Sequence, residues 1–353
     1  MDKTKMQITS DLGSDWWNDS CDLKELQDAV DQGAVGATSN PVIIKMVVEN
    51  KPDEWLPIID KLISESPNGT EDDITWALVD DIGTRAAKIL EPVYDKTNGE
   101  KGKLSLQVNP KYYPNPERMV EQAKNLAGLA PNVAIKCPAI GPGIEAIEEL
   151  VSQGITINAT VSFSVSQAIS CAEAIERGWK RAEENGVDTS NLSPYVTIMV
   201  GRIDDHLRGI ASEENITIDT DYLDWAGVAI FKRAYNIFKE RGFRGKLLSA
   251  AFRCHMHWSE LVGGNVVISM PYDWWNKFND SDIDVKSRMD QDVDKKIIDQ
   301  LQEKFVDFRR AYEEDGMSVD EFLKFGPSSR TLNQFLGGYD GLVGIVRERM
   351  LRT

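Results

Sequence analysis

The segment NVAIKCPA places Lys136 in the middle of an apolar run typical of a buried strand. A buried lysine is unfavourable unless it is neutral or paired with a carboxylate. An ordinary lysine, with a pKa of about 10.4, is unprotonated in only about one molecule in 2,500 at pH 7. A nucleophilic lysine therefore needs desolvation to lower its pKa toward about 7 to 8. The pattern alone equally allows a buried ion pair between Lys136 and Asp11.

Polar residues alternate with apolar ones along several predicted strands, so that each strand has one polar face. We expect these faces to converge inside a barrel, near the C-terminal strand ends where barrel enzymes keep their active sites. The alternative, amphipathic antiparallel strands with their polar faces in water, leaves the helices between them without a role. The polar faces carry, strand by strand, Gln7, Thr9 and Asp11; Ser105, Gln107 and Asn109; Ala134 and Lys136; Thr156, Asn158 and Thr160; Ser249, Ala251 and Arg253.

Eight short β-rich runs, most of them followed by an amphipathic helical stretch, predict an α/β fold, the closed (β/α)8 TIM barrel. An open doubly wound sheet also alternates strands and helices, but it normally stops at about five to seven strands. The predicted strands are 6–11, 35–40, 103–109, 133–139, 156–163, 195–201, 246–253 and 265–271.

Two segments exceed a minimal barrel in this chain of 353 residues. One is a helical insertion at about 51–92, and the other is a helical region at about 291–353. No linker rich in Pro, Gly or Ser separates either segment from the barrel, so we expect a single domain over residues 1–353.

The composition limits the partners and the compartment. With 57 acidic and 40 basic residues the formal charge is -17, which opposes binding to nucleic acid or to an anionic membrane. Cys21, Cys137, Cys171 and Cys254 form no CxxC pair, which favours reduced thiols. The N-terminus lacks the apolar core of a signal peptide, and no run of 18 apolar residues occurs. We expect a soluble, cytoplasmic protein.

Five motifs resemble those of the transaldolase family, in the order that the family has them. They are GATSNPVII (36–44), NVAIKCPA (132–139), GITINATVSFSVSQAISCAEA (154–174), VGRIDDHL (200–207) and AAFRC (250–254). The match covers some 220 residues. The resemblance implies a Schiff-base enzyme of sugar-phosphate metabolism, of the kind found in the pentose phosphate pathway, that needs no cofactor or metal. It leaves a homo-oligomer open.

The resemblance also assigns roles to individual residues. Lys136 would attack the C2 carbonyl of a ketose phosphate, and Asp11 would take the C4 hydroxyl proton as the C3–C4 bond breaks. The three-carbon dihydroxyacetone unit would remain as an enamine and then add to an aldose phosphate. The expected supporting residues are Asn40 and Asn158 for the hydroxyls, Thr160 for a water, and Thr197, Arg202 and Arg253 for the phosphate.

Two positions depart from the family pattern. Transaldolases usually have a glutamate at the position of Gln107, whereas the related fructose-6-phosphate aldolases have a glutamine, which cannot exchange a proton at neutral pH. Those aldolases also use a tyrosine that aligns with Met199, so the balance of transfer and cleavage stays open. Ala251 replaces a serine beside the phosphate arginine, which leaves room for a different anion such as a sulfonate.

Two hypotheses from other classes remain. Cys254, His255 and His257, with His206, suggest a metal-dependent barrel hydrolase, although the chain has only three histidines. Gln107 suggests a non-catalytic sugar-phosphate-binding protein, although Lys136 and Asp11 are both present. Trp16 and Trp17 are expected either to wall the pocket or to pack in the core.

Overall fold

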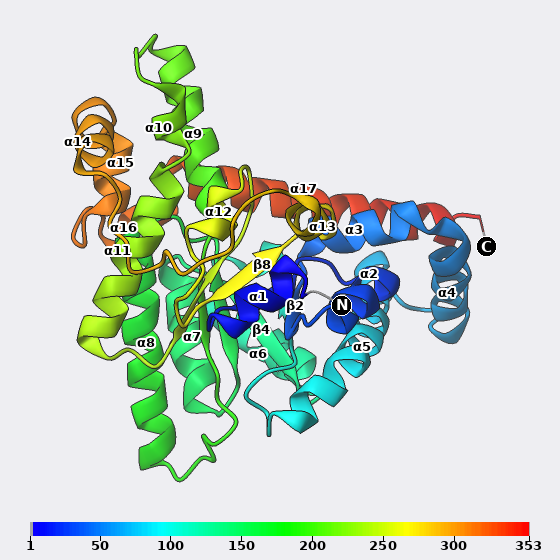
Figure 1. Cartoon of the computed structure of the whole chain (residues 1–353). Coiled ribbons are helices and arrows are strands. Elements are labelled where there is room, and N and C mark those ends of the chain that lie inside the picture. Colours follow the sequence, from blue (N-terminus) through cyan, green and yellow to red (C-terminus); the bar gives the residue numbers. More distant parts are fainter. Residues whose placement is uncertain (1–2, 353) are drawn as a thin grey trace.

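The computed structural model of the chain describes residues 3–352, in which eight parallel strands close into a barrel (Figure 1). The strand order follows the sequence, and β8 pairs with β1 to complete the ring. The predicted (β/α)8 barrel is confirmed. The strands are β1 (Asp15–Asn18), β2 (Gly36–Thr38), β3 (Lys103–Gln107), β4 (Val133–Pro138), β5 (Ile157–Thr160), β6 (Tyr195–Ile198), β7 (Lys246–Ser249) and β8 (Val267–Met270).

The prediction of a first strand at residues 6–11 is wrong. Residues Lys5–Asp11 form a helix, α1, whose start is fixed by a capping box between Thr4 and Gln7. The first strand is the later DWWN segment, where two tryptophans give a short run of high β propensity. Asp11 therefore lies on a helix before the barrel begins, and not on a barrel strand.

Helices cover the outside of the barrel, and further helices precede the first strand and follow the last one. Those that follow the first five strands are α2 (Leu23–Asp31), α3 (Pro41–Asn50), α4 (Pro52–Glu65), α5 (Glu71–Lys96), the 3-10 turn η1 (Pro110–Tyr112), α6 (Pro116–Ala127), α7 (Gly141–Ser152) and α8 (Val165–Glu184). The remainder are α9 (Val200–Glu213), α10 (Thr220–Leu223), α11 (Ala226–Arg241), α12 (Met256–Ser259), α13 (Tyr272–Asp280), α14 (Lys295–Lys304), α15 (Val306–Tyr312), α16 (Val319–Phe322) and α17 (Gly326–Met350).

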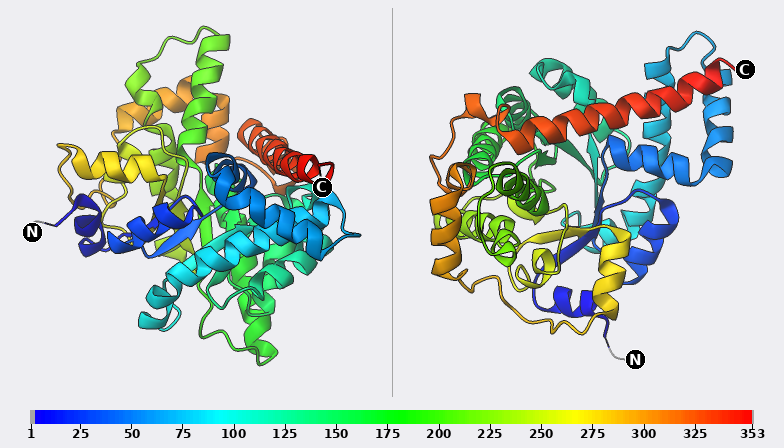
Figure 2. Two further views of the ribbon diagram at one scale, coloured as in Figure 1. Left: turned by 90° about the vertical axis from the view of Figure 1, so that its right-hand side faces the viewer. Right: turned by 90° about the horizontal axis from the view of Figure 1, so that it is seen from above.

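The segment expected to be a helical insertion, 51–92, holds α4 and most of α5. The helical region expected at about 291–353 holds α14 to α17. The long helix α17 packs against α3, α4 and α5, and it also contacts α9 (Figure 2). Among the helices of residues 3–352, none combines the length and the apolar composition needed to cross a membrane.

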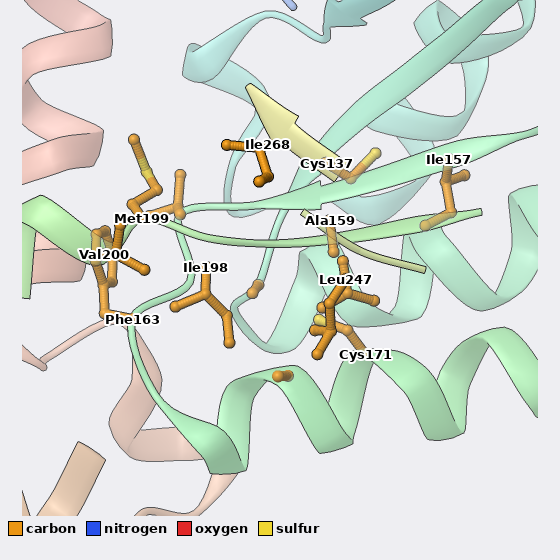
Figure 3. Packing of buried hydrophobic residues seen from close by; sticks show 14 of the residues in the cluster. Cys137, Ile157, Ala159, Phe163, Cys171, Ile198, Met199, Val200, Leu247 and Ile268 are labelled. Atoms are coloured by element: carbon orange, nitrogen blue, oxygen red, sulfur yellow. The ribbon is translucent and has the colours of Figure 1, made fainter. Parts of the chain in front are cut away.

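The outer faces of the strands pack against the helices through apolar side chains. Figure 3 shows Cys137 of β4, Ala159 of β5 and Leu247 of β7, with Ala159 and Leu247 lying between the strands and Cys171 of α8. All four side chains belong to one buried cluster. Burial raises the pKa of the Cys137 thiol to about 12, so this neighbour of Lys136 in sequence is an inert packing group outside the barrel.

The floor of the barrel interior is apolar. Trp17 packs edge-on against Tyr195, with their ring centroids 4.7 Å apart, in a small cluster with Leu248, Ala250 and Val267. A Cβ atom at Gly36 would lie 2.4 Å from the Trp17 ring, so the strand beside this indole needs a glycine. The polar site is built above this floor.

The prediction for the faces of β7 is also wrong. Leu248 and Ala250, and not Ser249, belong to the interior cluster with Trp17. Ser249 is in register with Ile198 and Ile268, which belong to the outer core, and its buried hydroxyl has no hydrogen-bond partner in the described structure. Because the outer face of β7 carries a serine, the sequence pattern wrongly predicted that this face points into the barrel.

Candidate active site

Lys136 lies on the interior face of β4 and is 6% exposed. Its Nζ donates a 3.0 Å hydrogen bond to the carbonyl oxygen of Ser39. Burial lowers the pKa of Lys136 to about 8, and the negative charge of Asp19 partly opposes this shift. A substantial fraction of this amine is therefore neutral near pH 7, as a nucleophile requires.

Asp19 directly follows the last residue of β1 and lines the same cavity as Lys136. The Thr38 hydroxyl donates a 2.5 Å hydrogen bond to its Oδ1 atom. Ser269 lies 2.7 Å from the same Thr38 oxygen, and because Thr38 has given its proton to Asp19, Ser269 is the donor. Burial raises the pKa of Asp19, whereas Lys136, Thr38 and Arg202 lower it.

Asp11, the aspartate expected to serve as acid and base, lies elsewhere. Its side chain is 51% exposed and forms an ion pair of 2.7 Å with Lys3, and it is not among the residues that line the cavity. The expectation failed because it rested on a strand at 6–11, which is α1. Asp19 was missed, although it follows a tryptophan-rich strand, the position where barrel enzymes hold reactive side chains.

The neighbouring strands place two amides beside Lys136. Gln107 on β3 and Asn158 on β5 are both in register with this lysine, so the three side chains point the same way at one level of the barrel. Asn158 donates to the Ser105 hydroxyl at 3.1 Å and accepts from the Thr197 hydroxyl at 2.7 Å. The buried Oε1 atom of Gln107 has no hydrogen-bond partner in residues 3–352. Asn158 is therefore fixed, while Gln107 keeps an unused acceptor.

Gln107 and Asn158 are not among the residues that line the cavity, whereas the predicted residues Asn40 and Thr160 line it together with Lys136. Asn40 caps α3, with its Oδ1 accepting the backbone N–H groups of Val42 and Ile43 at 2.9 and 3.1 Å. Its amide NH2 group is thereby turned away from the helix and can donate to a ligand. Thr160, at the end of β5, also lines the cavity.

Arg202 and Arg253 reach the cavity from the segments after β6 and β7. Burial lowers the pKa of Arg202, and the positive charge of Arg253 adds to this effect. The Nε atom of Arg202 is buried without a partner in the described part of the chain. Arg253 forms an ion pair of 2.7 Å with Asp205. Two arginines and an unused buried donor make this end of the cavity suited to an anion.

The cavity has a volume of about 390 Å³. Its cationic residues are Lys136, Arg202, Arg253 and Lys277, and its carboxylates are Asp19 and Asp273. The site is thus positive within a protein whose formal charge is -17. Of the predicted site residues, those that line it are Asn40, Lys136, Thr160, Thr197, Arg202 and Arg253.

The model of the transaldolase/fructose-6-phosphate aldolase family matches residues 16–324. The chain belongs to this family. The matched span includes Asp19 and excludes Asp11, in agreement with the geometry, and it ends before α17 begins at Gly326.

Several proteins named transaldolase are similar to this chain. Transaldolase 2 of Streptomyces avermitilis is 34% identical over 187 residues, which are 52% of this chain and 49% of that protein. The transaldolase of Thermobifida fusca is 30% identical over 231 residues, 60% of each chain. The transaldolase of Thiobacillus denitrificans is 28% identical over 260 residues, 69% of this chain and 70% of that protein. The chain spans about half the length of the Streptomyces avermitilis protein.

Two histidines of the metal-hydrolase hypothesis are paired with carboxylates. His257 forms a hydrogen bond of 2.7 Å with Asp204, and His206 forms one of 2.7 Å with Asp307. Within residues 3–352, no group of three or more His, Cys, Asp or Glu side chains is placed to hold a metal ion. Neither Trp16 nor Trp17 lines the cavity, so packing is the role of this pair.

Proposed function

We propose that this chain is a transaldolase that transfers a dihydroxyacetone unit from a ketose phosphate, such as fructose 6-phosphate, to an aldose phosphate. One observation carries the proposal. A buried lysine with a pKa lowered to about 8 shares a cavity with a partly buried carboxyl group and two arginines. A neutral amine, a proton acceptor and an anion site are the three groups that Schiff-base cleavage of a sugar phosphate requires.

The reaction begins when the neutral Lys136 amine attacks the C2 carbonyl carbon. The C2 oxygen leaves as water after it takes up one proton from the amine and one from the solvent, which gives a protonated Schiff base. Asp19 then takes the proton of the C4 hydroxyl while the C3–C4 bond breaks and its electron pair moves toward the iminium nitrogen. An aldose phosphate leaves, and the three-carbon unit stays on Lys136 as an enamine. The reverse steps on the acceptor aldose phosphate form the new bond, and water releases the product ketose and the free lysine.

The fixed amides suit the hydroxyl groups of the bound three-carbon unit. Asn40 has an amide NH2 group that its helix cap leaves free. Hydrogen bonds to Ser105 and Thr197 already fix the Asn158 side chain. Its remaining N–H can therefore bind a substrate hydroxyl without a further loss of side-chain entropy. Thr160 lines the cavity and supplies a hydroxyl that can hold the water of Schiff-base hydrolysis.

The arginines suit the terminal phosphate. A guanidinium can give two parallel hydrogen bonds to a phosphate, and the uncommitted Nε of Arg202 is available for one of them. Thr197 and Ala251 also line the cavity. Ala251 offers no hydroxyl to the bound anion. A sugar sulfonate, which the two arginines would also bind through its negative charge, is therefore the alternative substrate.

A fructose-6-phosphate aldolase, which releases free dihydroxyacetone, is the second candidate. Gln107 favours it, because an amide beside Lys136 can orient a water but cannot carry a proton. Met199, which lines the cavity, counts against it, because those aldolases have a tyrosine at this position and methionine has no hydroxyl. A sugar-phosphate-binding protein without turnover is the candidate from another class.

Turnover assays separate these candidates. The protein would be incubated with fructose 6-phosphate, with and without erythrose 4-phosphate, and free dihydroxyacetone and donor loss would be measured. Donor loss that requires the acceptor is the result expected for a transaldolase. Free dihydroxyacetone without acceptor indicates an aldolase, and no donor loss with a panel of ketose phosphates and sulfonates would leave only the binding protein.

A further inference from the structure

Asp204 and His257 form a buried pair behind the anion end of the cavity. Both side chains are 0% exposed, and neither lines the cavity. The Nε2 atom of His257 lies 2.7 Å from Oδ2 of Asp204, and the backbone N–H of Gly227 donates to Oδ1 of Asp204 at 2.8 Å. The reaction described above uses neither residue.

The other ring nitrogen of His257 holds the backbone of Arg253. The Arg253 N–H donates to Nδ1 of His257 at 3.0 Å, so Nδ1 must present a lone pair and Nε2 must carry the proton. Burial lowers the pKa of His257 while Asp204 and Cys254 raise it, to about 9. A second proton on Nδ1 would face the Arg253 N–H donor, so the hydrogen bonds assign the neutral ring in spite of that upward shift.

The backbone before Arg253 needs such support because it leaves the barrel through a strained turn. Strand β7 ends at Ser249, and Ala251 has a φ of 66°, in the left-handed region that non-glycine residues rarely adopt. The Ala251 carbonyl accepts the Gly201 N–H at 3.0 Å, and a Cβ atom at Gly201 would lie 2.1 Å from that oxygen. The direction of Arg253 therefore depends on contacts outside the strand.

We propose that Asp204 and His257 are positioning residues for Arg253. Asp204 accepts the Nε2 proton and so holds His257 in the tautomer whose Nδ1 can accept the Arg253 N–H. That bond fixes the backbone from which the guanidinium reaches the anion. This inference rests on the proposed function in one respect, because the anion that Arg253 binds is the phosphate of the proposed sugar phosphate.

The substitution Asp204→Asn tests the tautomer with little change of shape. The asparagine oxygen must keep accepting from the Gly227 N–H, so its NH2 group faces Nε2 of His257. Two donors cannot face each other, and the ring proton therefore moves to Nδ1. There it confronts the Arg253 N–H and breaks the bond that positions this residue, the effect that an Asp to Asn change has in a serine protease triad.

The first experiment needs no variant. Nitrogen-15 NMR of the three histidine rings at pH 7 would show for His257 one protonated and one unprotonated nitrogen, the latter being Nδ1. A ring with both nitrogens protonated, or with the proton on Nδ1, would overturn the proposal. In Asp204→Asn we expect the proton on Nδ1.

The second experiment separates positioning from folding. We expect Asp204→Asn to raise KM for fructose 6-phosphate about ten-fold, the effect of weakening one charge-assisted hydrogen bond, and to change kcat/KM for fructose less than about two-fold. The control is His255→Gln, since His255 is exposed and its ring forms a hydrogen bond of 3.1 Å with the hydroxyl of Ser259 on the short helix α12. Equal losses for both sugars would mean that the pair only stabilises the fold.

Failure of the proposed function is distinguishable from failure of this inference. If the protein turns over neither sugar, its dissociation constant for inorganic phosphate replaces KM, and the same rise of about ten-fold is expected for Asp204→Asn. An unchanged phosphate affinity together with an unchanged tautomer would contradict the positioning role, whatever reaction the protein catalyses.

Discussion

Arg202 of α9 donates a 2.6 Å hydrogen bond to the side-chain oxygen of Gln334 on α17, and this bond joins the barrel mouth to the C-terminal helix. The Phe335 ring lies 6.0 Å from the same guanidinium, in cation–π contact. Gln334 and Phe335 both line the cavity. The helix outside the family match therefore helps to shape the proposed anion site.

Replacing Gln334 by alanine should weaken phosphate binding. Arg202 would lose the acceptor that holds its guanidinium in place, and an arginine that must be ordered during binding binds less tightly. We expect KM for fructose 6-phosphate to rise about three- to ten-fold with kcat nearly unchanged. Asn333→Ala, at the exposed neighbouring position, is the control, and a KM equal to that of the wild type in both variants would show that the bond has no role in binding.

Asp19→Asn and Asp11→Asn form a matched pair that tests the position of the acid/base group. Asp19→Asn should still form a Schiff base but should lose C3–C4 cleavage by about 10² to 10⁴-fold, the usual contribution of a general base. Asp11→Asn should have the activity of the wild type, because Asp11 is exposed and outside the cavity. Steady-state rates with fructose 6-phosphate and erythrose 4-phosphate measure both. Loss of cleavage in the Asp11 variant would refute the assignment.

The rate of Schiff-base formation should rise with pH through about 8, the pKa to which burial lowers Lys136. The neutral amine is the nucleophile, and at pH 7 it makes up about one molecule in ten. The Asp19 carboxylate raises the pKa of Lys136, so Asp19→Asn should move the midpoint to lower pH. Stopped-flow rates of imine formation over pH 6 to 10, a range of about four units around this pKa, give both midpoints. A rate independent of pH would contradict the shift.

The same pKa predicts how stability depends on pH. In the unfolded chain Lys136 keeps its ordinary value of 10.5, so between about 8 and 10.5 the unfolded state binds more protons than the native state. The free energy of unfolding should therefore rise with pH across this window. Lys136→Met should reduce that rise. Lys103, whose pKa burial also lowers to about 8, should retain part of it. Urea titrations at several pH values measure the free energy of unfolding of the wild type and of Lys136→Met. An identical rise with pH in the two proteins would contradict the prediction.

Gln107→Glu should favour transfer and accelerate hydrolysis of the Schiff base. The buried Oε1 of Gln107 has no partner in the described structure and lies in register with Lys136, so a carboxyl group there could exchange a proton with a bound water. We expect kcat to rise about ten-fold. Because transaldolases usually have a glutamate at this position and the aldolases a glutamine, we also expect the ratio of transfer to free dihydroxyacetone release to increase. If the ratio stays constant, the residue at 107 does not decide between the two reactions.

The strand register of β3, β4 and β5 could be predicted because each strand alternates cleanly. Ser105 and Asn158 were predicted on interior faces, and the structure joins them by a hydrogen bond of 3.1 Å. In β1 and β7 the alternation was misleading. The helix α1 has polar residues at every second position by chance, and Ser249 puts a hydroxyl among apolar neighbours. Local alternation predicts a face only when the rest of the packing agrees with it.

The position of Arg253 could be predicted, but not the way in which it reaches the cavity. The sequence suggested a continuous strand to 253, whereas β7 ends at Ser249 and the chain turns at Ala251 with a φ of 66°. An alanine carries no signal for a left-handed backbone, and the hydrogen bonds around this turn come from distant residues, Gly201 to the Ala251 carbonyl and His257 to the Arg253 N–H. The hydrogen bond from Arg202 to Gln334 on α17 also joins distant parts of the chain, and no sequence motif marks Gln334.

Borohydride trapping tests the central claim most directly. The protein would be incubated with fructose 6-phosphate, reduced, digested and analysed by peptide mass spectrometry. Lys103 is an internal control, since burial also lowers its pKa to about 8 but it lies outside the cavity. We predict a reduced three-carbon adduct on the peptide with Lys136, none on the peptide with Lys103, and none in Lys136→Ala. No adduct on Lys136 with any of a panel of ketose phosphates and sulfonates would show that this lysine is structural.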